Sequence, residues 1–131
     1  MRADVLIPEA RELASGANFC VLSVLSGAEV RSYVMWVGVV GERLVVVSPS
    51  GSPKTEAILA SGRVTLLIWL DGHAYDYVEL RCRVSASETG GVARRMLEQT
   101  LAVKYRGRAY PRPDVTEWTM IELAPLTQRS W

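Results

Sequence analysis

Hydrophobic and polar residues alternate along several stretches of the chain with the period of two that is typical of β-strands. The clearest case is Tyr75 to Ser85, where positions 78, 80, 82 and 84 are apolar and positions 77, 79, 81 and 83 carry tyrosine, glutamate or arginine. Stretches rich in β-branched and aromatic residues predict five more strands, at Phe19 to Leu25, Val30 to Val39, Arg43 to Val47, Val64 to Leu70 and Glu117 to Leu123. Gly41 and Glu42 would turn the second of these back into the third as a hairpin.

Three short segments have helical features. Pro8 to Ser15 and Pro53 to about Ser61 each begin with proline and are followed directly by glycine. Val92 to Val103 carries apolar residues near helical spacing. Because short turns join most of the strands, the sequence favours an antiparallel arrangement over a parallel sheet with crossover helices. We therefore predict one domain over residues 1–131, a mainly β fold with about six strands in an antiparallel, Greek-key-like barrel and two or three helices.

Composition narrows the class of protein. The chain has 131 residues, of which 49% are hydrophobic and 22% charged, so it is not a disordered or fibrous chain. Fifteen basic and fourteen acidic side chains give a net charge of +1, and hence no strong field toward nucleic acid or an anionic membrane. Cys20 and Cys82 lie in apolar segments without metal-ligand spacing, which indicates buried thiols. We expect a cytoplasmic protein that has no secretory signal and binds neither nucleic acid nor membrane.

The loop that precedes the middle helix is the strongest candidate for chemistry. Ser48, Ser50 and Ser52 lie between the third strand and this helix, and Lys54 lies in the first turn of the helix. Free N–H groups and the helix dipole favour an anion at such a position, and a lysine adds a full charge. The segment predicts a phosphate site. An ordinary N-cap at Ser52 with a solvated Lys54 explains the same residues equally well.

Other candidates are weaker. His73, the only histidine, lies in a turn without partners for general-base or metal chemistry, and we expect no metal site. No glycine-rich nucleotide fingerprint or serine-nucleophile motif is present, so the sequence leaves any catalytic residue unknown. A basic run near the C-terminal third is best explained as a solvated surface; it comprises Arg94, Arg95, Arg106, Arg108 and Arg112.

The order and spacing of these motifs resemble the pyridoxamine 5'-phosphate oxidase-like family of FMN-binding split β-barrels. The matching features are the strand that contains Trp36, the Gly41 hairpin, the serine loop with Lys54 and the short helix that ends before Gly62. Residues 77–83 and the segment from Lys104 to Pro111 look closest to the flavin/deazaflavin oxidoreductase branch. The resemblance covers nearly the whole chain, from about Pro8 to Trp131.

The resemblance implies a homodimer that binds FMN, or alternatively the deazaflavin coenzyme F-420, in a groove between subunits. It places the cofactor phosphate at Ser48, Ser50 and Lys54, the tricyclic ring along the backbone of Val34, Met35 and Trp36, and an aromatic cover from the second subunit at Tyr75 and Tyr77. The apolar faces of Val64 to Leu70 agree with this, because a barrel interior covers one face and a partner could cover the other. The implied activity is hydride transfer between the cofactor and a small organic substrate. A non-catalytic flavin- or haem-binding module of the same fold is the alternative.

Overall fold

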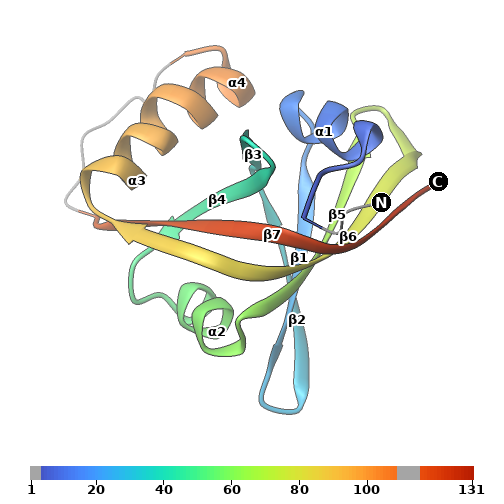
Figure 1. Ribbon diagram of the computed structural model, residues 1–131. Coiled ribbons are helices and arrows are strands. Elements are labelled where there is room, and N and C mark those ends of the chain that lie inside the picture. The colour runs from blue at the N-terminus through green and yellow to red at the C-terminus, as the bar shows by residue number, and fades with distance from the viewer. Residues whose placement is uncertain (1–3, 109–115) are drawn as a thin grey trace.

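The computed structural model describes residues 4–108 and 116–131 (Figure 1). Its first half contains α1 (Pro8–Ser15), β1 (Cys20–Ser26), β2 (Glu29–Met35), β3 (Gly38–Val40), β4 (Arg43–Pro49) and α2 (Pro53–Ser61). Its second half contains β5 (Arg63–Leu70), β6 (His73–Thr89), α3 (Gly91–Arg95), a π-helical segment η1 (Met96–Leu101), α4 (Ala102–Arg106) and β7 (Trp118–Ser130). The predicted mainly β fold with short helices is confirmed, and the helices begin and end close to the predicted positions.

The seven strands form one antiparallel sheet in the order β2-β1-β5-β6-β7-β4-β3. β2 and β3 lie at opposite edges of this sheet, yet only Trp36 and Val37 separate them in sequence. The sheet therefore has to curl until its two edges meet. No strand pairing joins β2 to β3 in the described residues, so the curled sheet stays split along this seam.

One predicted strand is wrong in extent. Val30 to Val39 is not a single strand, because its first part pairs with β1 and its second part pairs with β4, on the other edge of the sheet. Its residue types favour strand throughout, and only the distant partners require the break at Trp36 and Val37. The predicted hairpin is confirmed, with Val40 opposite Arg43 and Gly41 at a φ of 60°.

The core fills the inside of the curled sheet. Alternate side chains of the strands point inward, including Leu22, Leu44, Leu66, Leu80 and Leu123, and all of these are fully buried. α1 and α2 lie on opposite sides of the crossing strands and close the two ends of the core (Figure 1). Cys20 and Cys82 belong to this core as free buried thiols, as predicted, and burial raises the pKa of each to about 12.

The outer side of the sheet is covered over only part of its width. The segment α3–η1–α4 packs there, and Gly38 of β3 lies close to Leu101 of η1. The outward side chains of β2, β1, β5 and β6 have no such cover, and we call this surface the open face. It carries Val21, Val34, Leu67, Trp69 and Tyr77, none of which is buried.

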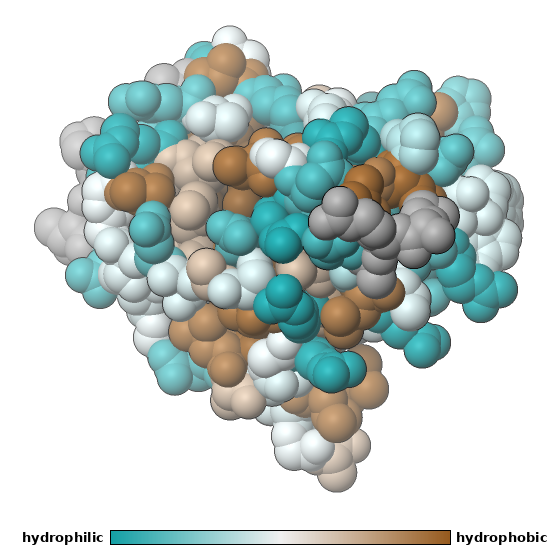
Figure 2. Space-filling model, in the orientation of Figure 1, coloured by the Kyte–Doolittle hydropathy of each residue, from teal (hydrophilic) through white to brown (hydrophobic). Residues whose placement is uncertain are grey.

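The barrel interior covers one face of β5, as expected, and the cover of its other face by a partner stays a prediction. Val64, Leu66 and Ile68 are buried inside the sheet, whereas Leu67 and Trp69 on the outer side are half-buried. On β2 the outward Val34 is 66% exposed. Hydrophobic residues also reach the surface around the β1–β2 hairpin at the bottom of the view in Figure 2. In the described part of the chain, no helix is long and apolar enough to cross a membrane.

Candidate functional site

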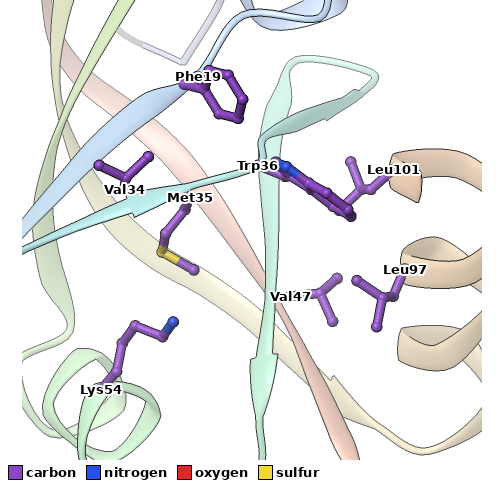
Figure 3. Close-up of a pocket in the computed structure, with 8 residues that line it drawn as sticks. All are labelled: Phe19, Val34, Met35, Trp36, Val47, Lys54, Leu97 and Leu101. Carbon is purple, nitrogen blue, oxygen red and sulfur yellow. The ribbon is translucent and has the colours of Figure 1, made fainter. Parts of the chain in front are cut away.

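A hollow of about 230 Å³ lies at the seam, between the end of β2 and the C-terminal helical segment. Its lining is mostly apolar and comes from β2, β4, α2 and η1, together with the residue just before β1 and the residue just after β2 (Figure 3). The lining residues are Phe19, Val34, Met35, Trp36, Val47, Lys54, Leu97 and Leu101. We call this space the seam hollow. It brings together four of the predicted cofactor residues, namely Val34, Met35, Trp36 and Lys54.

The end of β2 forms one wall of the seam hollow. Because β2 is an edge strand, half of its backbone N–H and C=O groups point away from β1 and are not used in the sheet. Val34 and Met35 alternate between the exposed outer side and the buried inner side, and Trp36 follows where the strand ends. A flat ligand at this wall would meet side chains and free backbone groups together.

Trp36 is held in place by an aromatic stack behind the wall. Its ring lies parallel to that of Tyr105, at a centroid distance of 5.2 Å and an interplanar angle of 2°. The Tyr105 hydroxyl donates to the Asn18 carbonyl at 2.6 Å and accepts from the Val37 N–H at 3.1 Å. Burial raises the pKa of Tyr105 to about 12, so this hydroxyl stays protonated and able to donate. The orientation of Trp36 is thus fixed from α4.

Lys104 is a second residue of α4 that bonds to the seam. Its ammonium group donates to the carbonyls of Ala14 and Val37 and lies 4.7 Å from the centre of the Tyr105 ring. Burial lowers the pKa of Lys104 to about 8. The side chain therefore links the end of α1, the seam between β2 and β3, and α4.

Lys54 reaches from α2 toward Met35 (Figure 3) and also borders a second hollow. This second hollow, of about 330 Å³, is lined by Tyr33, Pro49, Ser52, Pro53 and Lys54. The Lys54 ammonium lies 5.5 Å from the centre of the Tyr33 ring. Lys54 thus lines both the mostly apolar seam hollow and the second hollow beside the serine loop.

The serine loop itself is arranged differently from the prediction. Ser48 points to the inner side of β4 and is fully buried, and Ser50 donates to or accepts from the Thr119 hydroxyl at 2.6 Å. Ser52 caps α2 by accepting from the Thr55 N–H, which is the ordinary cap that the sequence left as an alternative. The three hydroxyls therefore do not converge on Lys54, because alternation along β4 turns Ser48 away from the side that carries Val47. Neither Ser48 nor Ser50 lines the hollows beside Lys54.

Tyr75 and Tyr77 lie apart from both hollows of the same chain. Tyr75 is 91% exposed near the β5–β6 turn, and Tyr77 stacks on Trp131 at 4.7 Å. Their predicted place over the cofactor of a second subunit stays a prediction. His73 is exposed at the start of β6, and no cluster of three or more metal-ligating side chains occurs in the residues that the structure describes.

The basic run is mostly surface, as expected. Arg94 pairs with Glu98 at 2.7 Å along the same helical segment, while Arg95, Arg106 and Arg108 are exposed. Arg112 and the loop around it lie outside the described residues.

Sequence reasoning missed half of the hollow's lining. Phe19, Val47, Leu97 and Leu101 join the site although nothing near them in sequence suggests a ligand. Leu97 and Leu101 are four residues apart, a spacing that predicts only one apolar helix face. Which surface that face covers depends on the packing of η1 against β4.

Comparisons with solved structures agree with this fold. An F420 reductase superposes with a TM-score of 0.77 at 18% identity, covering 94% of this chain and 98% of that one. A putative pyridoxamine 5'-phosphate oxidase from Listeria innocua gives 0.61 at 18% identity, with 86% of each chain covered. An FMN-binding, pyridoxamine 5'-phosphate oxidase-related protein from Nostoc punctiforme gives 0.59 at 12% identity, covering 90% and 75%.

The chain has the fold of the pyridoxamine 5'-phosphate oxidase-like proteins. This agrees with the family resemblance of the sequence and with the split of the sheet at Trp36 and Val37. No protein-family model and no curated protein matches the sequence. At these identities the similarity establishes the fold, and the function has to be argued from the site.

Proposed function

We propose that the protein is an oxidoreductase that binds the ring of FMN, or of a deazaflavin coenzyme, in the seam hollow. The observation that carries this proposal is the meeting of two hollows at Lys54, one walled by Trp36, Met35 and Phe19 and the other bordered by Ser52. A flavin-type cofactor combines a flat, largely apolar ring with an anionic phosphate, and the two hollows match these two parts. The solved structures with this fold include proteins named for F420 and FMN.

The residues present fit such a group. The free edge of β2 offers backbone donors and acceptors to the polar rim of a ring, and the Lys54 ammonium offers a charge-assisted hydrogen bond to a phosphate. The bound cofactor would supply hydride transfer to a small organic substrate. The chain itself would bind and orient: Trp36, fixed by Tyr105, sets the plane of the wall, and Leu97 and Leu101 exclude water from one side.

A second copy of the chain would complete the site. At about 230 Å³ the seam hollow is smaller than the roughly 300–1,000 Å³ of a typical small-molecule site, and it opens beside Val34 on the open face. The open face carries half-buried Leu67 and Trp69, which a two-fold partner would cover. In this homodimer, Tyr75 and Tyr77 of the second subunit are the aromatic residues expected to reach the cofactor.

Lys54→Ala tests the phosphate position. The purified protein is titrated with FMN and with the deazaflavin coenzyme, and binding is followed by cofactor absorbance and tryptophan fluorescence. A charge-assisted hydrogen bond contributes about 1.5–3 kcal/mol, so the affinity should fall by about tenfold or more while folding changes little. Arg95→Ala removes an exposed cation from α3 that lines neither hollow, and should leave the affinity unchanged.

Failure to bind either cofactor, with the dimer intact, would contradict the proposal. An unchanged affinity in Lys54→Ala would place the phosphate elsewhere and leave the ring position to be tested at Trp36.

A non-catalytic binding module is the second candidate. Among the described residues that line the seam hollow, Lys54 is the only titratable side chain, and these residues include no acid–base pair that would mark turnover. Reduction of bound FMN by NAD(P)H, or oxidation of the reduced deazaflavin by candidate acceptors, distinguishes the two. Tight binding without electron transfer would favour the module.

A further inference from the structure

A groove of about 510 Å³, separate from the two hollows beside Lys54, lies at the opposite end of the open face from the seam hollow. The β1–β2 hairpin forms one side of it. β1 pairs with β5 only as far as Ser23, opposite Thr65, while β1 and β2 continue as a hairpin to Ser26 and Glu29. The hairpin thus extends away from the rest of the sheet at the bottom of Figure 1. β5 and β6 provide the other side of the groove.

Three arginines lie together on the β5–β6 side. Arg63 is directly opposite Arg83, and Arg81 is opposite Thr65, so all three point to the outer side of two neighbouring strands. Arg63 and Arg81 line the groove, and all three side chains are exposed. None of them has an ion pair or a side-chain hydrogen bond within the described parts of the chain.

This arrangement is unfavourable by itself. Like charges directly opposite each other on paired strands destabilise a sheet. The nearest acidic residue on the same side of β6 is Glu79, which lies opposite Leu67 and Arg129 rather than opposite an arginine of the group. A bound anion would remove the repulsion between the guanidinium groups.

Beside the arginines, the groove is lined by three polar residues, Ser23, Ser61 and Thr65, and by a larger apolar part. Val30 and Leu25 of the hairpin are 69% and 57% exposed, and both line the groove opposite the arginines. Leu126 of β7 also lines the groove. It is an extra residue in the pairing of β6 with β7, because Arg81 pairs with Thr127 and the next residue, Cys82, pairs with Pro125. A bulge of this kind directs a side chain that regular pairing would place elsewhere.

We propose that this groove binds a small organic anion, a carboxylate or phosphate carried on an apolar body. The guanidinium groups of Arg63 and Arg81 would hold the anionic head in paired hydrogen bonds, and Val30, Leu25 and Leu126 would cover the apolar part. Val30 and Val34 are four residues apart on β2, roughly 13 Å, so the groove is distinct from the seam hollow. The inference does not depend on the proposed cofactor.

The test uses octanoate, octyl phosphate and the neutral octanamide as probes, with binding measured by calorimetric titration. The wild-type protein should bind at least one of the two anions at least about tenfold more tightly than octanamide, because each guanidinium adds a charge-assisted hydrogen bond. The relative affinity of octanoate and octyl phosphate identifies the preferred head group. In the double variant Arg63→Gln/Arg81→Gln, the anion should bind about as weakly as octanamide.

Arg95→Gln/Arg106→Gln is the matched control, since it also removes two exposed positive charges, from the C-terminal helical segment. It should retain wild-type affinity for the anion. A second readout needs no ligand: at low ionic strength Arg63→Gln should raise the melting temperature, and the better-bound anion should reduce this difference.

Two results would overturn the proposal. One is equal affinity of the wild type and Arg63→Gln/Arg81→Gln for both anions. The other is that the wild type binds neither anion more tightly than octanamide; a change of oligomeric state in the double variant would then assign the arginines to contact with a second copy.

Discussion

Lys104 is a cation without an acidic partner in the described structure. Its ammonium group is satisfied by two carbonyl oxygens, those of Ala14 and Val37, and by the face of Tyr105. These groups accept hydrogen bonds but do not neutralise the charge, so desolvation dominates and lowers the pKa to about 8. The folded protein thus favours the neutral amine more strongly than the unfolded chain does.

This shift gives stability a specific pH dependence. Between about pH 8 and the ordinary lysine pKa of 10.5, the unfolded chain keeps a proton on Lys104 that the folded protein has released, so the contribution of Lys104 to stability rises with pH. Lys104→Met removes the titration. The free energy of unfolding of the wild type, relative to that of Lys104→Met, should increase from pH 8 to pH 10.5, measured by urea denaturation at several pH values.

The comparison with the variant is necessary because other buried groups act in the opposite direction. Burial raises the pKa values of Tyr105, Cys20 and Cys82 to about 12, so each of these groups makes the folded protein less stable as the pH rises above its unfolded value. Their contribution is largely common to both proteins and cancels in the difference, except that the charge on Lys104 itself lowers the pKa of Cys20. A difference that stays constant across this range would show that Lys104 is not desolvated in the folded protein.

At the scale of the elements, the packing of the C-terminal helical segment on the sheet depends on a single small residue, Gly38. Gly38 begins β3, and a Cβ atom there would lie 3.1 Å from Leu101 and 3.2 Å from Val45. Both neighbours are 1% exposed, so a shift of either side chain would disturb the packing of η1 on the sheet. The absence of a side chain at position 38 is what lets η1 approach the sheet closely enough to form the seam hollow.

Gly38→Ala should therefore destabilise the protein, by about 1–3 kcal/mol as for other overpacked core positions. Urea denaturation of four proteins measures this: wild type, Gly38→Ala, Leu101→Ala and the double variant. Removing the Leu101 side chain creates space, so Gly38→Ala should cost less in the Leu101→Ala background. Equal costs in both backgrounds would mean that the helical segment does not pack on β3 as described.

At the scale of the whole molecule, the open face would be exposed to solvent in a monomer and covered by a second copy in the proposed homodimer. Leu67 lies near its centre, between Val21 on β1 and Glu79 on β6, and is half-buried in the single chain. A charge placed at position 67 would cost the isolated fold little stability. A two-fold partner on the open face would desolvate this charge, and that would disfavour the dimer.

Leu67→Lys should convert the protein from a dimer to a 14.5 kDa monomer in sedimentation equilibrium. Val103→Lys, at a 45% exposed position on α4 outside the open face, should leave the dimer unchanged. If the wild type itself sediments as a monomer, the open face has no second copy on it and the cofactor site would have to be complete within one chain.

The local periodicity of the sequence determined most of the elements. It gave the inward and outward sides of β6, the β3–β4 hairpin, the beginning and end of α1 and α2, and the buried state of both cysteines. These features depend on a residue and its near neighbours, because side-chain direction follows the period of the strand or helix and glycine or proline sets its ends.

Tertiary structure alone decided where β2 ends and β3 begins, that Ser48 is turned away from Lys54, and that Leu97 and Leu101 line the same hollow as Trp36. Each of these depends on pairing or packing with residues far away in the chain. The residue types near Trp36 favour a continuous strand, and it is the curl of the sheet, with its two edges brought together at positions 36 and 37, that interrupts the strand and creates the hollow.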